Sequence, residues 1–262
     1  MTSIIDILNP SVVWVKTETS LFILLLLAIL ILAIVYFSRS GHVAEVRKLP
    51  AIDALDEIVQ STAERGKPFA ISAAGFGGSN MTTFNACLNV AKYLAQRCGE
   101  MQVPVHGICD DEKTYLLLSD YVRQGVIESK NPTIFHNENF YYVPLSAFPT
   151  ESIGFVQKII PGGAYFFGQH FQDGSLSSVD LARQYGAVSF GTSGWVPGWA
   201  NCFLVAMCDY SVFSDELVAV STYLTKDEKM AATVVGLDWV KLFSLGALTI
   251  LIILGTMGVK LI

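Results

Sequence analysis

The chain has 262 residues, of which 52% are hydrophobic and 15% are charged. The charged fraction lies well below the roughly 25% typical of soluble domains, which indicates a chain that is partly embedded in a lipid bilayer. The net charge of −6 at pH 7 argues against a nucleic-acid partner, because proteins that bind nucleic acids present an excess of basic residues.

The first apolar run, residues 21–37, contains no charged residue. A helix needs about 20 apolar residues to cross the hydrocarbon core of a bilayer, with about 17 as the lower limit. The run therefore predicts a transmembrane helix. A buried core helix and a cleaved signal peptide are the alternatives. Asp6, Lys16 and Glu18 precede the run in place of a basic segment, which favours an uncleaved anchor.

Short apolar strands then alternate with helices along residues 48–237. Strands are expected at 68–72, 103–108, 140–143, 164–167, 187–190 and 210–213, and helices at 49–65, 82–97, 110–125, 149–160, 176–185, 198–208 and 215–224. This alternation predicts an α/β, Rossmann-like sandwich, with a mainly parallel sheet of five or six strands covered on both faces.

The second apolar run, residues 242–259, predicts another transmembrane helix over residues 242–260, again with a buried core helix as the alternative. Basic residues near the two runs are more frequent between them than outside them, where only Lys16 and Lys260 lie. Those between the runs are Arg39, Arg47, Lys48, Lys226, Lys229 and Lys241. The positive-inside rule therefore predicts a cytoplasmic central domain and extracytoplasmic termini, including residues 1–20.

Five cysteines lie in the central domain, and none forms a CxxC pair (Cys87, Cys98, Cys109, Cys202 and Cys208). An odd number of cysteines without a pairing motif favours free, buried thiols over a disulfide framework or a zinc site. Such thiols are typical of a reducing compartment and agree with a cytoplasmic domain.

A glycine-rich segment, residues 75–80, follows a predicted strand and precedes a predicted helix. A dinucleotide-binding fold places its phosphate loop at this point, because N–H groups at a helix N-terminus attract anions. Asn80 stands where the third glycine of GxGxxG is expected, and Asp110 comes too late for the acid expected about 20 residues on. A nucleotide or other anion is therefore the minor hypothesis, and a tight turn or a subunit contact is favoured. The candidate ligands are the backbone and side chains of Gly75, Gly77, Gly78, Ser79 and Asn80.

No catalytic, cofactor-binding or metal-binding pattern is complete. Asp110, Asp111 and Glu112 are consecutive, so a helix would point them in different directions, and a capped, solvated helix start is expected. A pocket lined by His170, Asp173 and Asp209 would favour an enzyme. Ser193 lacks the GxSxG pattern of a hydrolase nucleophile. No catalytic residue, cofactor or metal is therefore predicted.

Large aromatic residues accompany the later glycine-rich stretches, at Phe171, Trp195 and Trp199. They could line a pocket together with His170. Exposed aromatic side chains beside glycine-rich loops are also typical of protein–protein contact surfaces. The contact surface is the favoured interpretation.

The segment Cys208–Leu224, with its CDY start, its Asp215-Glu216-Leu217 step and its AxSxYL end, is followed by Asp238-Trp239 and Lys241. These residues resemble an uncharacterised family of bacterial and archaeal membrane proteins with two transmembrane helices, a domain of unknown function. The resemblance covers most of residues 48–241 and implies an α/β domain at the plasma (inner) membrane of a prokaryote. It implies no activity. Gly174 stands where the family pattern has a glutamate, which weighs against an enzyme.

The favoured functional hypothesis is a membrane-anchored structural or assembly protein. Its cytoplasmic domain would form a homo-oligomer or dock into a larger membrane complex, because anchors at both ends restrict its orientation and favour lateral contacts. The alternative is a ligand-sensing module that binds a nucleotide or another anion at residues 75–80. A transporter is disfavoured, since neither apolar run carries an ionisable residue in its interior.

Overall fold

A computed structural model describes residues 48–74, 81–168, 176–193 and 205–226, together with isolated positions between 231 and 249. The chain divides into two units, one of which consists of residues Val46–Asp227. The strands and the long helices described below all belong to this unit, and it contains the candidate site.

The described strands form one six-stranded sheet in the order β3-β2-β1-β4-β5-β6. Each neighbouring pair is parallel. In chain order the strands are β1 (Phe69–Ala74), β2 (Val105–Cys109), β3 (Phe140–Tyr142), β4 (Gly163–Gly168), β5 (Val188–Ser193) and β6 (Tyr210–Phe213). The predicted α/β fold with a mainly parallel sheet of five or six strands is confirmed.

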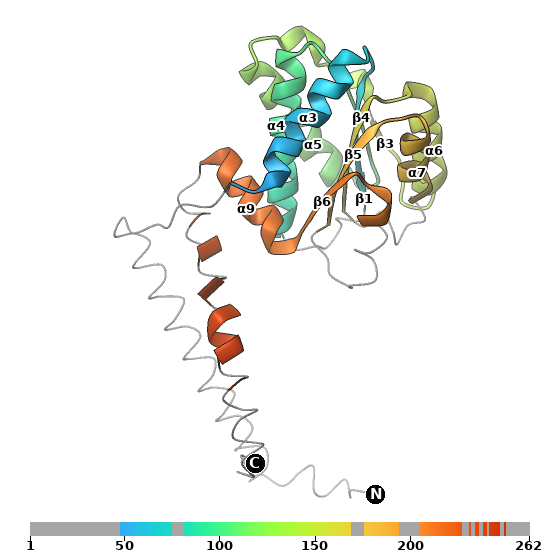
Figure 1. The fold of residues 1–262 in the computed structure, drawn as a ribbon. Coiled ribbons are helices and arrows are strands. Elements are labelled where there is room, and N and C mark those ends of the chain that lie inside the picture. The colour runs from blue at the N-terminus through green and yellow to red at the C-terminus, as the bar shows by residue number, and fades with distance from the viewer. Residues whose placement is uncertain are drawn as a thin grey trace, which may run out of the picture. The chain divides into compact units, whose positions relative to one another are not determined.

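Helices cover both faces of the sheet (Figure 1). On one face lie α3 (Pro50–Glu64), α4 (Met81–Glu100), α5 (Glu112–Glu128) and α9 (Ser214–Thr225), and on the other lie α6 (Phe148–Ile159) and α7 (Leu176–Gln184). Two short 3-10 helices, η1 (Pro132–Ile134) and η2 (Asn137–Asn139), precede β3.

Burial explains why the central strands are almost wholly apolar. Every residue of β1 (FAISAA) and of β4 (GAYFFG) is buried, because helices pack on both faces of these strands. The edge strands β3 and β6 are shorter and partly exposed. On the α6 and α7 face, the core joins strand residues such as Ala74, Ile108 and Phe166 to Phe148 and Phe155 of α6.

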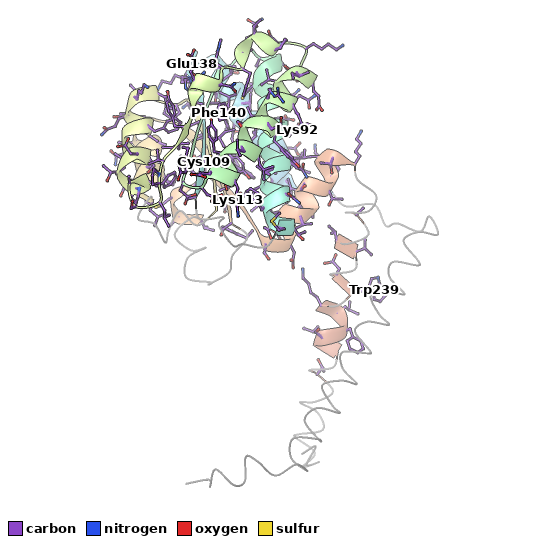
Figure 2. All side chains as sticks on the ribbon, turned by 180° about the vertical axis from the view of Figure 1, so that it is seen from behind. Lys92, Cys109, Lys113, Glu138, Phe140 and Trp239 are labelled. Atoms are coloured by element: carbon purple, nitrogen blue, oxygen red, sulfur yellow. The ribbon has the colours of Figure 1, made fainter. Side chains whose placement is uncertain are left out.

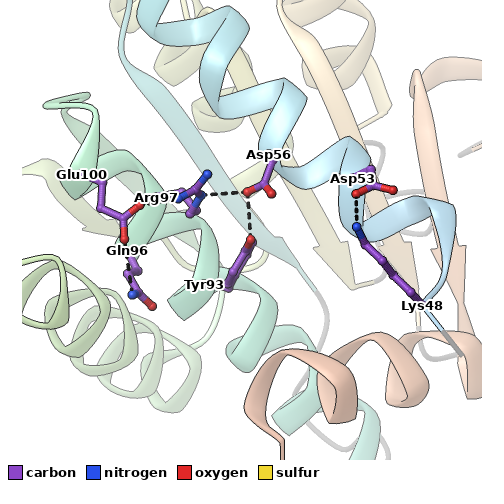
Figure 3. Close-up of polar contacts among 7 residues, drawn as sticks. All are labelled: Lys48, Asp53, Asp56, Tyr93, Gln96, Arg97 and Glu100. Carbon is purple, nitrogen blue, oxygen red and sulfur yellow. Dashed lines mark hydrogen bonds and ion pairs between the residues drawn. The ribbon is translucent and has the colours of Figure 1, made fainter. Parts of the chain in front are cut away.

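The two ends of this unit lie side by side. Lys48, just before α3, pairs with Asp53 in the first turn of that helix (Figure 3). The hydrogen bond to Asp53 raises the pKa of Lys48, and a weaker contribution comes from Tyr223 in α9. Figure 1 accordingly shows the beginning of α3 next to α9. The chain therefore enters and leaves the unit at neighbouring points.

The predicted membrane spans fall largely outside the described residues. Residues 21–37 are not among them, and the second run is described only at 242–246 and 249, where the backbone is helical. Within the described part of the chain, no helix combines the length and the apolar character needed to cross a bilayer. The two spans stay predictions.

Candidate functional site

The order of the strands defines a switch point between β1 and β4. From β1 the chain proceeds outward to β2 and β3, and it then returns to the other side of β1 to add β4, β5 and β6. All six strands are parallel, so their carboxyl ends meet at one edge of the sheet. In open α/β sheets of this order, ligands bind outside the carboxyl ends of the strands at the switch point.

A row of four residues crosses the sheet at this edge. Ala74 of β1 pairs directly with Gly168 of β4. The last β1–β2 pair is Ala73 with Cys109, so Asp110 follows at the level of Ala74. The last described β4–β5 pair is Phe167 with Thr192, so Ser193 lies at the level of Gly168. Ala74 belongs to the core cluster that includes Phe148 and Phe155, which places this row on the α6 and α7 face.

The row has small residues in its middle and polar residues at its sides. Ala74 and Gly168 have almost no side chain, whereas Asp110 and Ser193 are polar and only 6% and 1% exposed. Neighbouring strands lie about 4.8 Å apart, so Asp110 and Ser193 stand about 14 Å apart across three strand intervals. At this edge of the sheet, two small residues therefore lie between two buried polar groups, the Asp110 carboxyl and the Ser193 hydroxyl.

Gly168 has a conformational reason to be glycine. Its φ of +103° lies in a region that residues with a Cβ rarely adopt. The backbone can turn at this point, at the end of β4, only because no side chain is present. The same absence leaves the middle of the row without a side chain at Gly168.

The two neighbouring acids after β2 have different roles. Asp111 is the N-cap of α5, because its carboxylate accepts hydrogen bonds from the Thr114 backbone N–H at 3.0 Å and from Thr114 Oγ1 at 3.1 Å. The predicted capped helix start is thus confirmed for Asp111. For Asp110 the predicted solvated position is wrong, since this residue is buried at the end of β2.

Asp110 comes later than the expected spacing of about 20 residues, yet it closes the second strand. Helix α4 is 20 residues long, and β2 ends at Cys109, so the residue that directly follows the strand is Asp110. A dinucleotide-binding fold places its ribose-binding acid at this position. The position of this acid depends on where β2 ends and not on the number of residues that precede it.

The other predicted site residues lie outside the described residues. Gly75, Gly77, Gly78, Ser79 and Asn80 connect Ala74 of β1 to Met81 of α4. Phe171 follows β4 in the chain, and Trp195 and Trp199 follow β5. His170 and Asp173 also lie outside. Their roles in ligand binding, protein contact or catalysis stay predictions.

Four cysteines, Cys87, Cys98, Cys109 and Cys208, are free and buried. Burial raises the pKa of the Cys87 thiol to about 12, partly offset by its hydrogen bond to Thr192. The four thiols are therefore protonated at neutral pH and behave as small core side chains. Among the residues that the structure describes, no group of three or more histidine, cysteine, aspartate or glutamate side chains could hold a metal ion.

The model of a protein family described as a domain of unknown function, DUF6754, matches residues 9–262. The chain belongs to this family. The predicted membership of an uncharacterised family is thereby confirmed, while the membrane topology that the resemblance implied stays a prediction. A search of curated proteins found no match to this DUF6754 chain.

In this DUF6754 chain, the CDY segment (Cys208–Tyr210) forms hydrogen bonds that hold β6 against β5 and α3. Asp209 accepts hydrogen bonds from the Ser189 backbone N–H at 2.8 Å and from Ser189 Oγ at 3.0 Å. Cys208 is buried, and the Tyr210 hydroxyl donates to Glu57 of α3 at 2.9 Å. These contacts lie at the amino ends of β5 and β6. Asp209 therefore lies at the opposite edge from the switch point, while the pocket that it would line with His170 and Asp173 stays a hypothesis, because those two residues lie outside the described part of the chain.

Proposed function

We propose that this protein is a membrane-anchored module that binds a nucleotide at the switch point between β1 and β4. The observation that carries the proposal is the row of Asp110, Ala74, Gly168 and Ser193 at the carboxyl edge of the sheet. Within the row, Ala74 directly precedes the glycine-rich segment 75–80 in the chain, and that segment leads into α4.

The N-terminus of α4 and the residues of the row suit different parts of a nucleotide. The first N–H groups and the dipole of a 20-residue helix such as α4 favour a phosphate at its N-terminus. A buried carboxylate such as Asp110 accepts hydrogen bonds from the ribose hydroxyls. Ala74 and Gly168 are small, so a ligand bound at the N-terminus of α4 and at Asp110 can approach the ends of β1 and β4.

Membrane anchoring is the second part of the proposal. The uncharged runs at 21–37 and 242–259 support one helix at each end of the chain. The neighbouring positions of Lys48 and Tyr223 support it further, since two anchors attached at these points would hold the domain from one side. The excess of basic residues between the runs supports a cytoplasmic domain at the inner membrane of a prokaryote.

The test compares two adjacent acids. Full-length protein in a mild detergent is titrated with ATP and NAD⁺, and ligand-induced stabilisation is measured for the wild type, Asp110→Asn and Asp111→Asn. Hydrogen bonds to charged groups contribute about 1.5–3 kcal/mol, so Asp110→Asn should weaken nucleotide binding roughly 10- to 100-fold. Asp111→Asn is the matched control, because asparagine caps a helix as well as aspartate does.

Two results would overturn the proposal. One is a wild-type protein that binds neither nucleotide at millimolar concentration and carries none in native mass spectrometry. The other is an equal loss of affinity in both variants, which would indicate a general effect on the fold.

An assembly role is the second candidate function, and it rests on apolar side chains exposed on α5. Leu116, Leu117 and Ile127 are 65%, 38% and 55% exposed, and Leu116 and Ile127 lie eleven residues apart, or three helical turns, on the same stripe. Such a stripe suits contact with a second copy or with another subunit of a membrane complex. Native mass spectrometry of the wild type and of Leu116→Glu tests it. A multimer that dissociates in the variant would support assembly, and a monomeric wild type would refute it.

A further inference from the structure

A second group of polar side chains lies around His106, near the amino end of β2, and has no role in the proposed nucleotide site. It consists of His106 in β2, Tyr141 in β3, Lys158 in the last turn of α6, and His136 between η1 and η2. Ile108 pairs with Tyr141, and side chains alternate along a strand, so His106 and Tyr141 lie on the α6 face of the sheet.

Lys158 and Tyr141 are in direct contact. The Lys158 ammonium group donates a hydrogen bond to the Tyr141 hydroxyl oxygen at 3.3 Å and lies 5.1 Å from the centroid of the ring. Phe155 packs edge-on against the same ring, with centroids 6.1 Å apart. The tyrosine ring is thus held between the sheet and α6, and among the described residues its hydroxyl proton has no acceptor.

His106, on the same face of the sheet, has an unused polar atom. Its Nδ1 is buried and has no hydrogen-bond partner among the described residues. Burial lowers the pKa of His106, and electrostatic interactions with Lys158 and His136 lower it further. A buried ring nitrogen without a partner costs free energy that a bound ligand would recover.

Lys158 adds a positive charge near His106, although the whole protein has a net charge of −6. Among the ion pairs of the described residues, none involves Lys158 or His136. Glu138 of η2 is the acid nearest to His136 in the sequence, and it is exposed. Figure 2 shows Glu138 at the end of the domain away from Lys113, which lies near the carboxyl end of β2.

We propose that His106, His136 and Lys158, with the Tyr141 hydroxyl, form a second ligand site that takes a phosphate group. A phosphate offers several acceptor oxygens, which match an ammonium group, two imidazoles and a phenol that all can donate. The chemistry is the same for inorganic phosphate and for a small phosphate ester. None of its residues belongs to the row at the switch point, so the site is independent of the nucleotide site.

The test uses the coupling between anion binding and histidine protonation. A bound phosphate favours the charged imidazolium, so it must raise the pKa of His106. The four histidines of the full-length protein in detergent are isotopically labelled, and each is titrated by NMR in inorganic phosphate, in glycerol phosphate and in sodium chloride at equal ionic strength. We expect both phosphates to raise the pKa of His106 by about 0.5 or more relative to chloride.

Two variants separate the site from a general salt effect. Lys158→Met should weaken phosphate binding roughly tenfold, since it removes a charged donor from an exposed position without disturbing the core. Lys113→Met, which removes an equally exposed charge near the carboxyl end of β2, should leave binding unchanged. The same shift of the His106 pKa in chloride, or an unaltered response in Lys158→Met, would overturn the proposal. A response to inorganic phosphate but not to glycerol phosphate would limit the site to the free ion.

Discussion

Replacement of Gly125 by alanine tests how closely α5 packs on α4. A Cβ at Gly125 would lie 2.3 Å from the Lys92 carbonyl oxygen, 3.1 Å from the Gln96 backbone nitrogen and 3.2 Å from the Ala95 Cβ. Carbon and carbonyl oxygen normally approach no closer than about 3.3 Å. The two helices would therefore have to separate by about 1 Å, because a carbonyl within a helix cannot move alone.

Two opposing terms decide the size of the effect. Alanine in place of glycine within a helix stabilises it by about 1 kcal/mol. Overpacking of a core contact costs about 1–3 kcal/mol, and the upper end applies where the obstacle is backbone. We therefore expect Gly125→Ala to lower the free energy of unfolding by about 2 kcal/mol, which lowers Tm by about 4–8 °C for a domain of this size.

Gly154 of α6 provides the matched control, because a Cβ there would have no atom within 4 Å. Gly154→Ala keeps only the favourable helix term and should raise Tm by about 2–4 °C. Both variants and the wild type are unfolded thermally as full-length protein in detergent and followed by far-UV circular dichroism. If Gly125→Ala stabilised the protein as much as Gly154→Ala does, the described contact between α5 and α4 would be wrong.

Three further predictions concern buried polar groups. Tyr165→Phe should destabilise the protein by about 1–2 kcal/mol in thermal unfolding, because it removes the hydroxyl that lies 2.9 Å from Thr192 Oγ1 in the core. His106 has a lowered pKa in the folded state, so the unfolded state binds more protons below its ordinary value of 6.5. Stability should therefore fall as the pH drops below about 6.5, and His106→Gln should reduce this fall in pH-dependent unfolding experiments. The thiol of Cys87, whose pKa burial raises to about 12, should resist alkylation at pH 8 until denaturant is added, as mass spectrometry would show.

The alternation of short apolar strands and helices was enough to predict the fold class. The predicted strands at 68–72, 103–108 and 164–167 overlap β1, β2 and β4, because strands buried on both faces are almost continuously apolar. The order of the strands could not be predicted in this way. It depends on which side of β1 receives β4, and the pattern within each strand is the same for either choice.

The candidate site was harder to predict than the fold. Asp110 and Asp111 are adjacent in the sequence, and only the end of β2 and the start of α5 make one a buried group and the other a cap. The row itself combines residues far apart in the chain, Ala74, Asp110, Gly168 and Ser193, and depends on strand register. The spacing of residues along the sequence does not reveal this register.

The neighbouring ends of the domain have a consequence for its synthesis. Lys48 and Tyr223 are 175 positions apart, and the elements that bring them together, β6 and α9, are the last elements of this domain to be made. Until they emerge from the ribosome, β5 remains an open edge and the surface of α4 that α9 covers is exposed. An unpaired strand edge and an uncovered apolar helix face are the surfaces by which nascent chains aggregate. A chain truncated before residue 210 would therefore become a client of chaperones and proteases.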